Sequence, residues 1–189
     1  MDRLGEWSYR GYLPHFNAKS IYQLVTFRLA DALPEEAIRK LAEMAIDAPA
    51  SRKTLEKYLD AGYGSALLRK HENAEVMRDT LLHFHRTKYV LHAWVVMPNH
   101  VHVLLDPSPR FTVGQIVRSW KGFSAYKIGK AELAYGRKNL RVWQPDYFDR
   151  YIRDEAHYRA ACSYIAENPV KAGLVTSASQ WKWSSAYAE

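Results

Sequence analysis

The chain has 189 residues, enough for one domain with a sizeable core and too few for two comfortable ones. Its 27 Lys and Arg residues outnumber its 20 Asp and Glu residues, and the net charge of +7 favours a polyanionic partner such as nucleic acid. The single cysteine, Cys162, excludes an internal disulfide framework and the usual multi-cysteine zinc sites. The start of the chain lacks the apolar run of a signal peptide, and no stretch reaches membrane-spanning length. We therefore expect a soluble, cytoplasmic protein with no membrane partner.

The first half of the chain predicts one strand and three helices after a loop-like start. Near alternation of β-branched and aromatic residues over 20–30 predicts a strand. Proline, acidic residues and helical apolar spacing over 34–48 predict a helix. A shorter helix is expected over 52–60, and the Gly-broken block 49–70 that contains it is a possible insertion. Residues 72–86 have a helical period again.

The second half alternates between β-like runs and amphipathic helices. The β-like runs cover 89–97, 100–105 and 141–152, and the helices cover 112–133 and 154–167. In the longer helix, Thr112 is the expected cap and Phe123 is one of the expected inward residues. This order resembles the ferredoxin-like split βαβ pattern, an α+β fold with a central antiparallel sheet and here a helical insertion. Without repeats or linkers, residues 1–189 are expected to form one domain.

Two histidines, His100 and His102, lie one residue apart in the apolar run WVVMPNHVHVLL. Residues two apart in a strand project from the same face, so the two imidazoles point together, as a divalent metal requires. His83 and His85 have the same spacing, but in a helical pattern they diverge by roughly 200° and cannot share a metal. A simpler interpretation stays open, in which His100 and His102 occupy the solvated face of a half-buried strand.

A metal held by two histidines has open positions, and the last helix offers two further polar side chains. Tyr164 and Asn168 are four residues apart, which places them on one helical face. Two alternatives stay open here. Tyr164 is also compatible with a core position that leaves its hydroxyl at the rim, and Asn168 with a cap on a short turn that starts at Pro169.

Four segments together resemble a known family, the single-tyrosine HUH transposases, and within it the REP-associated tyrosine transposases of bacteria. The segments are RGYLPHFNAKSIYQLVTFRLADALP, WVVMPNHVHVLL, VWQPDYFDRYIRDEAHY and YIAENPVKAGLV. The resemblance implies a ferredoxin-like domain of the HUH endonuclease type. It implies His100 and His102 as metal ligands, Tyr164 as the nucleophile, and Asn168 as the side chain that completes the metal site.

The same resemblance implies a reaction. A Mg²⁺ or Mn²⁺ ion would orient the phosphate and neutralise developing charge, and the mixed nitrogen and oxygen ligands suit Mn²⁺ at least as well as Mg²⁺. Attack by Tyr164 would leave a 5′-phosphotyrosine and a free 3′-hydroxyl, and rejoining needs no ATP because one phosphoester replaces another. The implied substrate is single-stranded DNA beside a hairpin, the repetitive extragenic palindrome (REP).

Basic residues on the long helix and just after it are candidates for contacts with DNA phosphates. They are Arg118, Lys121, Lys127, Lys130, Arg137, Lys138 and Arg141. Each is equally compatible with a solvated face that binds nothing. Trp143 and Tyr147 are compatible with stacking on bases, although core packing is the simpler interpretation.

Three other functions stay open. The first is a catalytically retired protein that holds the DNA hairpin without cutting it. The second is an RNA-binding domain, since RRM modules share the topology, although their aromatic strand pattern is absent. The third is a metal-dependent phosphodiesterase that uses water and would therefore survive replacement of Tyr164. The sequence leaves open whether the protein is a monomer or a homodimer.

Overall fold

The computed structural model describes residues 6–10, 13–17, 21–44 and 49–188. Its centre is a four-stranded sheet in the order β4-β5-β3-β6, in which every neighbouring pair is antiparallel. The strands are β3 (Gln23–Arg28), β4 (Tyr89–Val96), β5 (His100–Pro107) and β6 (Phe148–Tyr151). The short strand β6 lies at one edge, as Pro145 just before it predicts. This strand order confirms the ferredoxin-like α+β fold.

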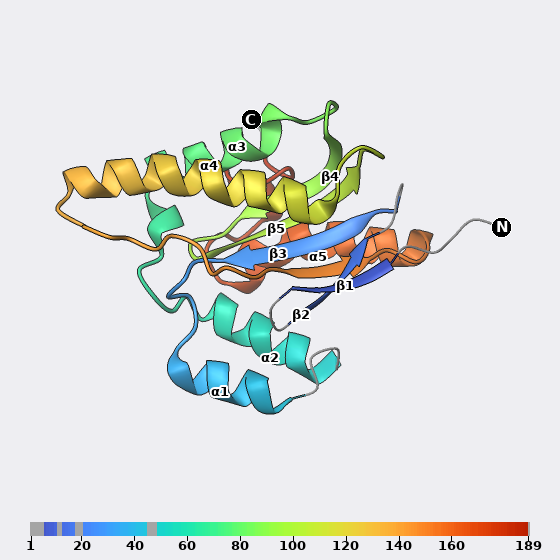
Figure 1. The fold of residues 1–189 in the computed structure, drawn as a ribbon, viewed down its shortest axis with the longest axis horizontal. Helices are drawn as coiled ribbons and strands as arrows, with labels where there is room; N and C mark the ends of the chain where they lie inside the picture. Colours follow the sequence, from blue (N-terminus) through green and yellow to red (C-terminus); the bar gives the residue numbers. More distant parts are fainter. Residues whose placement is uncertain (1–5, 11–12, 18–20, 45–48, 189) are drawn as a thin grey trace.

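Helices cover both faces of this sheet (Figure 1). They are α1 (Glu35–Glu43), α2 (Pro49–Asp60), α3 (His71–His83), α4 (Val113–Ala134) and α5 (Glu155–Lys171), with short 3-10 helices at Leu67–Arg69 and Ala178–Gln180. One face packs against α3 and α4 through residues such as Phe27, Met77 and Trp120. The opposite face packs against α5 through residues such as Leu104 and Ile165. No helix in the described part of the chain is both long and apolar enough to cross a membrane.

The predicted block 49–70 contains α2, which lies with α1 beside the sheet (Figure 1). After α2 the chain turns back through Gly62 and Gly64, both at positive φ. At Gly64 the backbone passes so close to Asp31 that an added Cβ would lie 2.3 Å from the Asp31 carbonyl oxygen. The Ser65 N–H also donates a hydrogen bond to the Asp31 carboxylate. This contact ties the end of the α2 segment to the loop that follows β3.

The sequence predicted a loop-like start of the chain, and this prediction is wrong. Residues 6–17 contain an antiparallel pair, β1 (Glu6–Arg10) and β2 (Leu13–Asn17), in which Trp7 pairs with Phe16. Pro14 is tolerated in β2 because a two-stranded ribbon consists of edges only, where the missing N–H of proline breaks no inner ladder. Two other predicted elements, 20–30 and 34–48, extend partly into residues outside the described ranges.

The long helix α4 begins as predicted and differs in its buried face. The Thr112 hydroxyl accepts a hydrogen bond from the Gln115 N–H, and the Gln115 side chain accepts one from the Thr112 N–H, which completes a capping box. The expectation that Phe123 points inward is wrong, because its side chain is 52% exposed. The next residue, Ser124, lies inward and bonds to the indole of Trp143. Trp143 is therefore part of the core, the simpler of its two interpretations.

The two glycines after α2 give a matched test of the close approach between Gly64 and the Asp31 backbone. We expect Gly62→Ala to cost about 1–2 kcal/mol, since it adds only left-handed strain. Gly64→Ala adds the same strain and also forces the Asp31 backbone to move, so we expect about 3 kcal/mol. Urea unfolding of both variants measures the difference. Equal losses would contradict the contact between Gly64 and Asp31.

Candidate functional site

The two histidines of β5 lie in the middle of the sheet and point toward α5. His100 and His102 alternate with Val101 and Val103, which pack on the α3 and α4 side. The imidazole centroids of the histidines are 4.7 Å apart. His100 is 1% exposed and His102 is 2% exposed. The open alternative of a solvated strand face is therefore wrong.

Each histidine is held in place through its Nδ1 atom. The Nδ1 of His100 lies 2.7 Å from the Asn99 side-chain oxygen, and the Nδ1 of His102 lies 2.7 Å from the Thr26 hydroxyl oxygen. The Asn99 amide nitrogen in turn donates to the carbonyl oxygens of Leu59 and Tyr63. Both Nε2 atoms are thereby turned toward α5. Such supporting contacts fix the tautomer and orientation of histidine ligands in metal sites.

Helix α5 brings Tyr164 and Asn168 to the same place. The Tyr164 hydroxyl oxygen is 3.3 Å from the Nε2 of His102, and the two rings meet edge to face. The helix continues through Pro169 to Lys171, beyond the predicted end near 167. Asn168 therefore lies inside the helix, where it is buried, and the alternative in which it caps a new turn is wrong.

Burial keeps both histidines neutral. It lowers the pKa of His100 to about 3, and the neighbouring Asn168 amide opposes this only in part. Burial, followed by the nearby His100, holds the pKa of His102 well below its usual range. Neutral imidazoles have a free nitrogen lone pair at physiological pH, which is the form that binds metals.

Two carboxylates of α2 lie near the tyrosine. Burial raises the pKa of Tyr164 above its ordinary value, and Glu56 and Asp60 raise it further. Glu56, with His102 and Tyr164, also lines a shared pocket. From α5, the Lys171 ammonium lies 5.2 Å from the centre of the Tyr164 ring. Glu56 was not among the residues predicted from the sequence, although its spacing of four from Asp60 on a helix indicates that both share a face.

The donor atoms present fit a small divalent cation. The Nε2 of His100 and the side-chain oxygen of Asn168 are both buried and have no hydrogen-bond partner. Buried polar atoms are rarely left without a hydrogen-bond partner, and where they are, a bound ion or water is a common explanation. Within the described ranges, no cluster of three or more His, Cys, Asp or Glu side chains could hold a metal. The candidate set is thus two imidazole nitrogens and one amide oxygen, which leaves room for phosphate oxygens.

The structure divides the seven basic candidates into two groups. Arg118, Lys121 and Arg141 line a groove of about 740 Å³ between α4 and residues 140–147, here called the α4 groove. The Lys121 ammonium donates to the carbonyl oxygens of Pro145 and Asp146. The other four are exposed outside this groove, and Arg137 is 3.6 Å from the buried carboxylate of Glu132. They are Lys127, Lys130, Arg137 and Lys138.

Lys121 should titrate unusually low. Burial lowers the pKa of Lys121 to about 8, although Asp146 opposes the shift. The unfolded chain has the ordinary lysine pKa near 10.4 and so binds more protons between about pH 8 and pH 10.4. This group therefore makes the folded state more stable as the pH rises through that window. We expect an Nζ resonance with a midpoint near pH 8 in NMR titrations, lost in Lys121→Met.

The stability of the same variant is a second measurement. The free energy of unfolding of the natural chain should rise relative to that of Lys121→Met between pH 8 and pH 10. A Lys121 midpoint in the ordinary lysine range, or a constant difference in stability, would contradict the buried position of the ammonium.

Comparisons with known proteins agree with the resemblance seen in the sequence. Over 111 residues the chain is 27% identical to the REP-associated tyrosine transposase of Escherichia coli (strain K12), covering 58% of this chain and 62% of that relative. The chain thus matches about three fifths of the relative's length. A solved structure of a REP-associated tyrosine transposase bound to a REP hairpin is similar with a TM-score of 0.53 and 24% identity. That match covers 94% of this chain and 81% of the other, and it supports the fold.

A family model described as "Transposase IS200 like" matches residues 66–168. The matched range contains both histidines of β5 and extends through Tyr164 to Asn168. Because it spans more than half of the 189 residues, the chain belongs to the IS200-like transposase family.

Proposed function

We propose that the protein is a metal-dependent endonuclease and strand transferase that acts on single-stranded DNA beside REP-type hairpins. The observation that carries this proposal is the convergence of His100, His102, Asn168 and Tyr164, with the Tyr164 hydroxyl 3.3 Å from the Nε2 of His102. A nucleophile beside a metal-type donor set is the arrangement that tyrosine transesterification requires. The relative named as a REP-associated tyrosine transposase supports this function.

His100, His102 and Asn168 would hold Mg²⁺ or Mn²⁺ with their Nε2, Nε2 and Oδ1 atoms. When bound, the ion supplies charge neutralisation at the scissile phosphate. Thr26 and Asn99 keep the two imidazoles in the required orientation. Since both imidazoles stay neutral, they bring no positive charge that would repel the ion.

Tyr164 would attack the phosphorus, form a bond from its Oη, and break the bond from phosphorus to the 3′-oxygen. The products are a 5′-phosphotyrosine and a strand that ends in a 3′-hydroxyl, once that oxygen takes up a proton. The phenol is protonated at neutral pH, so its proton has to leave during attack. The Glu56 carboxylate, which lines the same pocket as Tyr164, offers that proton an acceptor.

The α4 groove is the candidate surface for the hairpin. Arg118, Lys121 and Arg141 bring three cations to one hollow, and phosphate contacts of this kind supply affinity without sequence information. Binding should therefore weaken strongly as salt concentration rises.

The nucleophile can be tested with a matched tyrosine on the same helix. We expect Tyr164→Phe to abolish a covalent adduct with a hairpin oligonucleotide in Mn²⁺, scored by denaturing gel and intact mass. Tyr158→Phe should keep the adduct, because that hydroxyl bonds to His92. Cleavage that persists in Tyr164→Phe would favour attack by water, and tight binding with neither cleavage nor adduct would favour a retired binding protein.

The metal site can be tested by binding alone. We expect Asn99→Ala to weaken Mn²⁺ binding about 10–100-fold, as is typical when the residue that orients a ligand is lost. Asn168→Ala should weaken it at least as much while changing the midpoint of thermal unfolding little, since its side-chain oxygen has no partner to lose. Isothermal titration measures both.

Asn73→Ala is the matched control for these asparagines. Asn73 is buried too, but it donates to Glu132 and to the Leu67 carbonyl oxygen, on the α3 and α4 side. It should lose stability and keep its Mn²⁺ affinity. A loss of folding equal to the loss of metal binding in Asn168→Ala would overturn its role as a ligand.

A further inference from the structure

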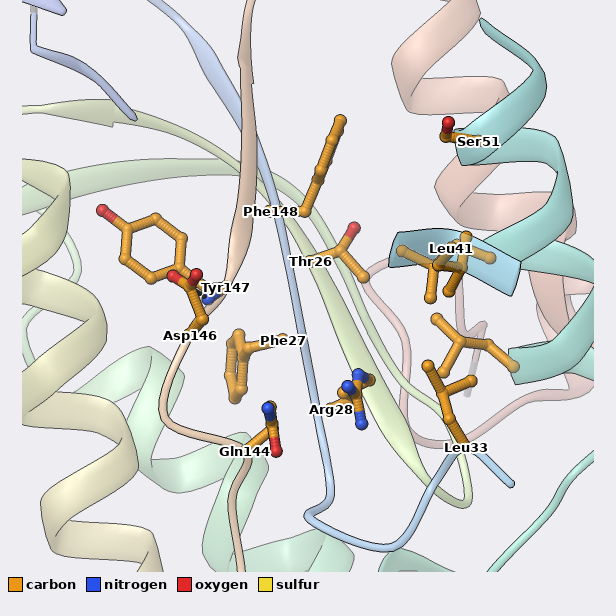
Figure 2. A pocket seen from close by; sticks show the side chains of 12 residues that line it. Thr26, Phe27, Arg28, Leu33, Leu41, Ser51, Gln144, Asp146, Tyr147 and Phe148 are labelled. Carbon is orange, nitrogen blue, oxygen red and sulfur yellow. Dashed lines mark hydrogen bonds between the residues drawn. The ribbon is translucent and has the colours of Figure 1, made fainter. Parts of the chain in front are cut away.

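A second hollow adjoins the tyrosine site, between β3 and helix α2. We call it the β3–α2 pocket; it has a volume of about 180 Å³. Its wall is formed largely by Leu33, Leu41, Leu55 and Leu59. Phe148 and Arg28 project from the sheet on the same side as Leu33 and Leu41 (Figure 2). Because drug-sized ligands occupy about 300–1,000 Å³, this pocket suits one small flat group.

The β3–α2 pocket lies on a continuous path. It shares Thr26 and Phe148 with the pocket that contains His102 and Tyr164. At its other end it shares Gln144 and Asp146 with the α4 groove. A strand whose hairpin lies in the α4 groove would therefore pass this pocket before its scissile phosphate reaches Tyr164.

The chemistry of the pocket suits a nucleobase. Its leucines and the Phe148 ring form a flat apolar environment, and stacking on an aromatic ring is how proteins hold unpaired bases. The Arg28 guanidinium supplies a polar edge, and its Nη1 atom is buried with no hydrogen-bond partner. An arginine fork matches a pair of acceptor atoms on a base edge, most often O6 and N7 of guanine.

We propose that the β3–α2 pocket holds one unpaired base of the strand that joins the hairpin to the cleavage site, with Phe148 stacked on it and Arg28 reading its acceptor edge. This proposal rests on the proposed function. It adds a contact by which the protein selects a base away from the scissile phosphate. Guanine is the base that this contact favours, because its O6 and N7 atoms present two acceptors on one edge.

The test removes one base at a time. A hairpin oligonucleotide with single-stranded flanks is made with an abasic site at each flank position, and dissociation constants are measured by anisotropy in EDTA, where no cleavage occurs. We expect one position at which base loss weakens binding about tenfold. In Phe148→Ala the intact oligonucleotide should bind about tenfold more weakly, and base loss at that position should then have no further effect.

Two more variants keep the result interpretable. Leu41 on α1 lines the β3–α2 pocket and not the Tyr164 pocket, so Leu41→Trp fills the former from the side away from the tyrosine and should remove the same base dependence. Phe123→Ala removes an exposed phenylalanine on α4 and should retain the full dependence. Arg28→Lys should keep binding and lose the preference for guanine, because lysine cannot make the paired contact.

The outcomes separate the two proposals. If base loss and Phe148→Ala weaken binding independently, or if no flank position matters, the base pocket is wrong while hairpin binding and the Tyr164 adduct stand. If the natural chain neither binds the hairpin nor forms the adduct, the proposed function itself fails.

Discussion

Strand β5 carries the constraint on which the site depends. It lies between β3 and β4 with helices on both faces, so every side chain from His100 to Leu105 is buried. Side chains alternate across a strand, so two histidines on one face require two apolar residues on the other, and the valines meet that need. A buried polar ring costs free energy unless its nitrogens are satisfied, and here Asn99 and Thr26 satisfy the two Nδ1 atoms. The remaining nitrogens are therefore directed at a single point below α5.

Much of this arrangement follows from local patterns in the sequence. The period of a strand is enough to predict that His100 and His102 share one face. The period of a helix is enough to predict the same of Tyr164 and Asn168, which are four residues apart. The order of elements was enough for the ferredoxin-like topology. Local patterns cannot predict that these four side chains meet at one site. That expectation came from the resemblance to a known family.

Other parts depended on tertiary contacts that no local pattern contains. Thr26 supports His102 only because β3 and β5 pair in one register. Asn99 supports His100 only because the α2 segment brings the carbonyl oxygens of Leu59 and Tyr63 to it. The helical period predicted that Phe123 points inward, but at that level of α4 the smaller Ser124 faces Trp143. The pair β1 and β2, two strands of five residues each, was not predicted either.

The position of α1 and α2 in the chain has a consequence for how such proteins diversify. The range that matches the family begins at residue 66 and contains His100, His102, Tyr164 and Asn168, whereas both helices precede it. The two helices nevertheless wall the β3–α2 pocket, and through Leu59 they reach the residue that orients His100. The proposed site and the pocket beside it thus depend on contacts between the matched range and the two helices that precede it. Under the proposed function, a change in α2 would alter this pocket and the support of His100 together.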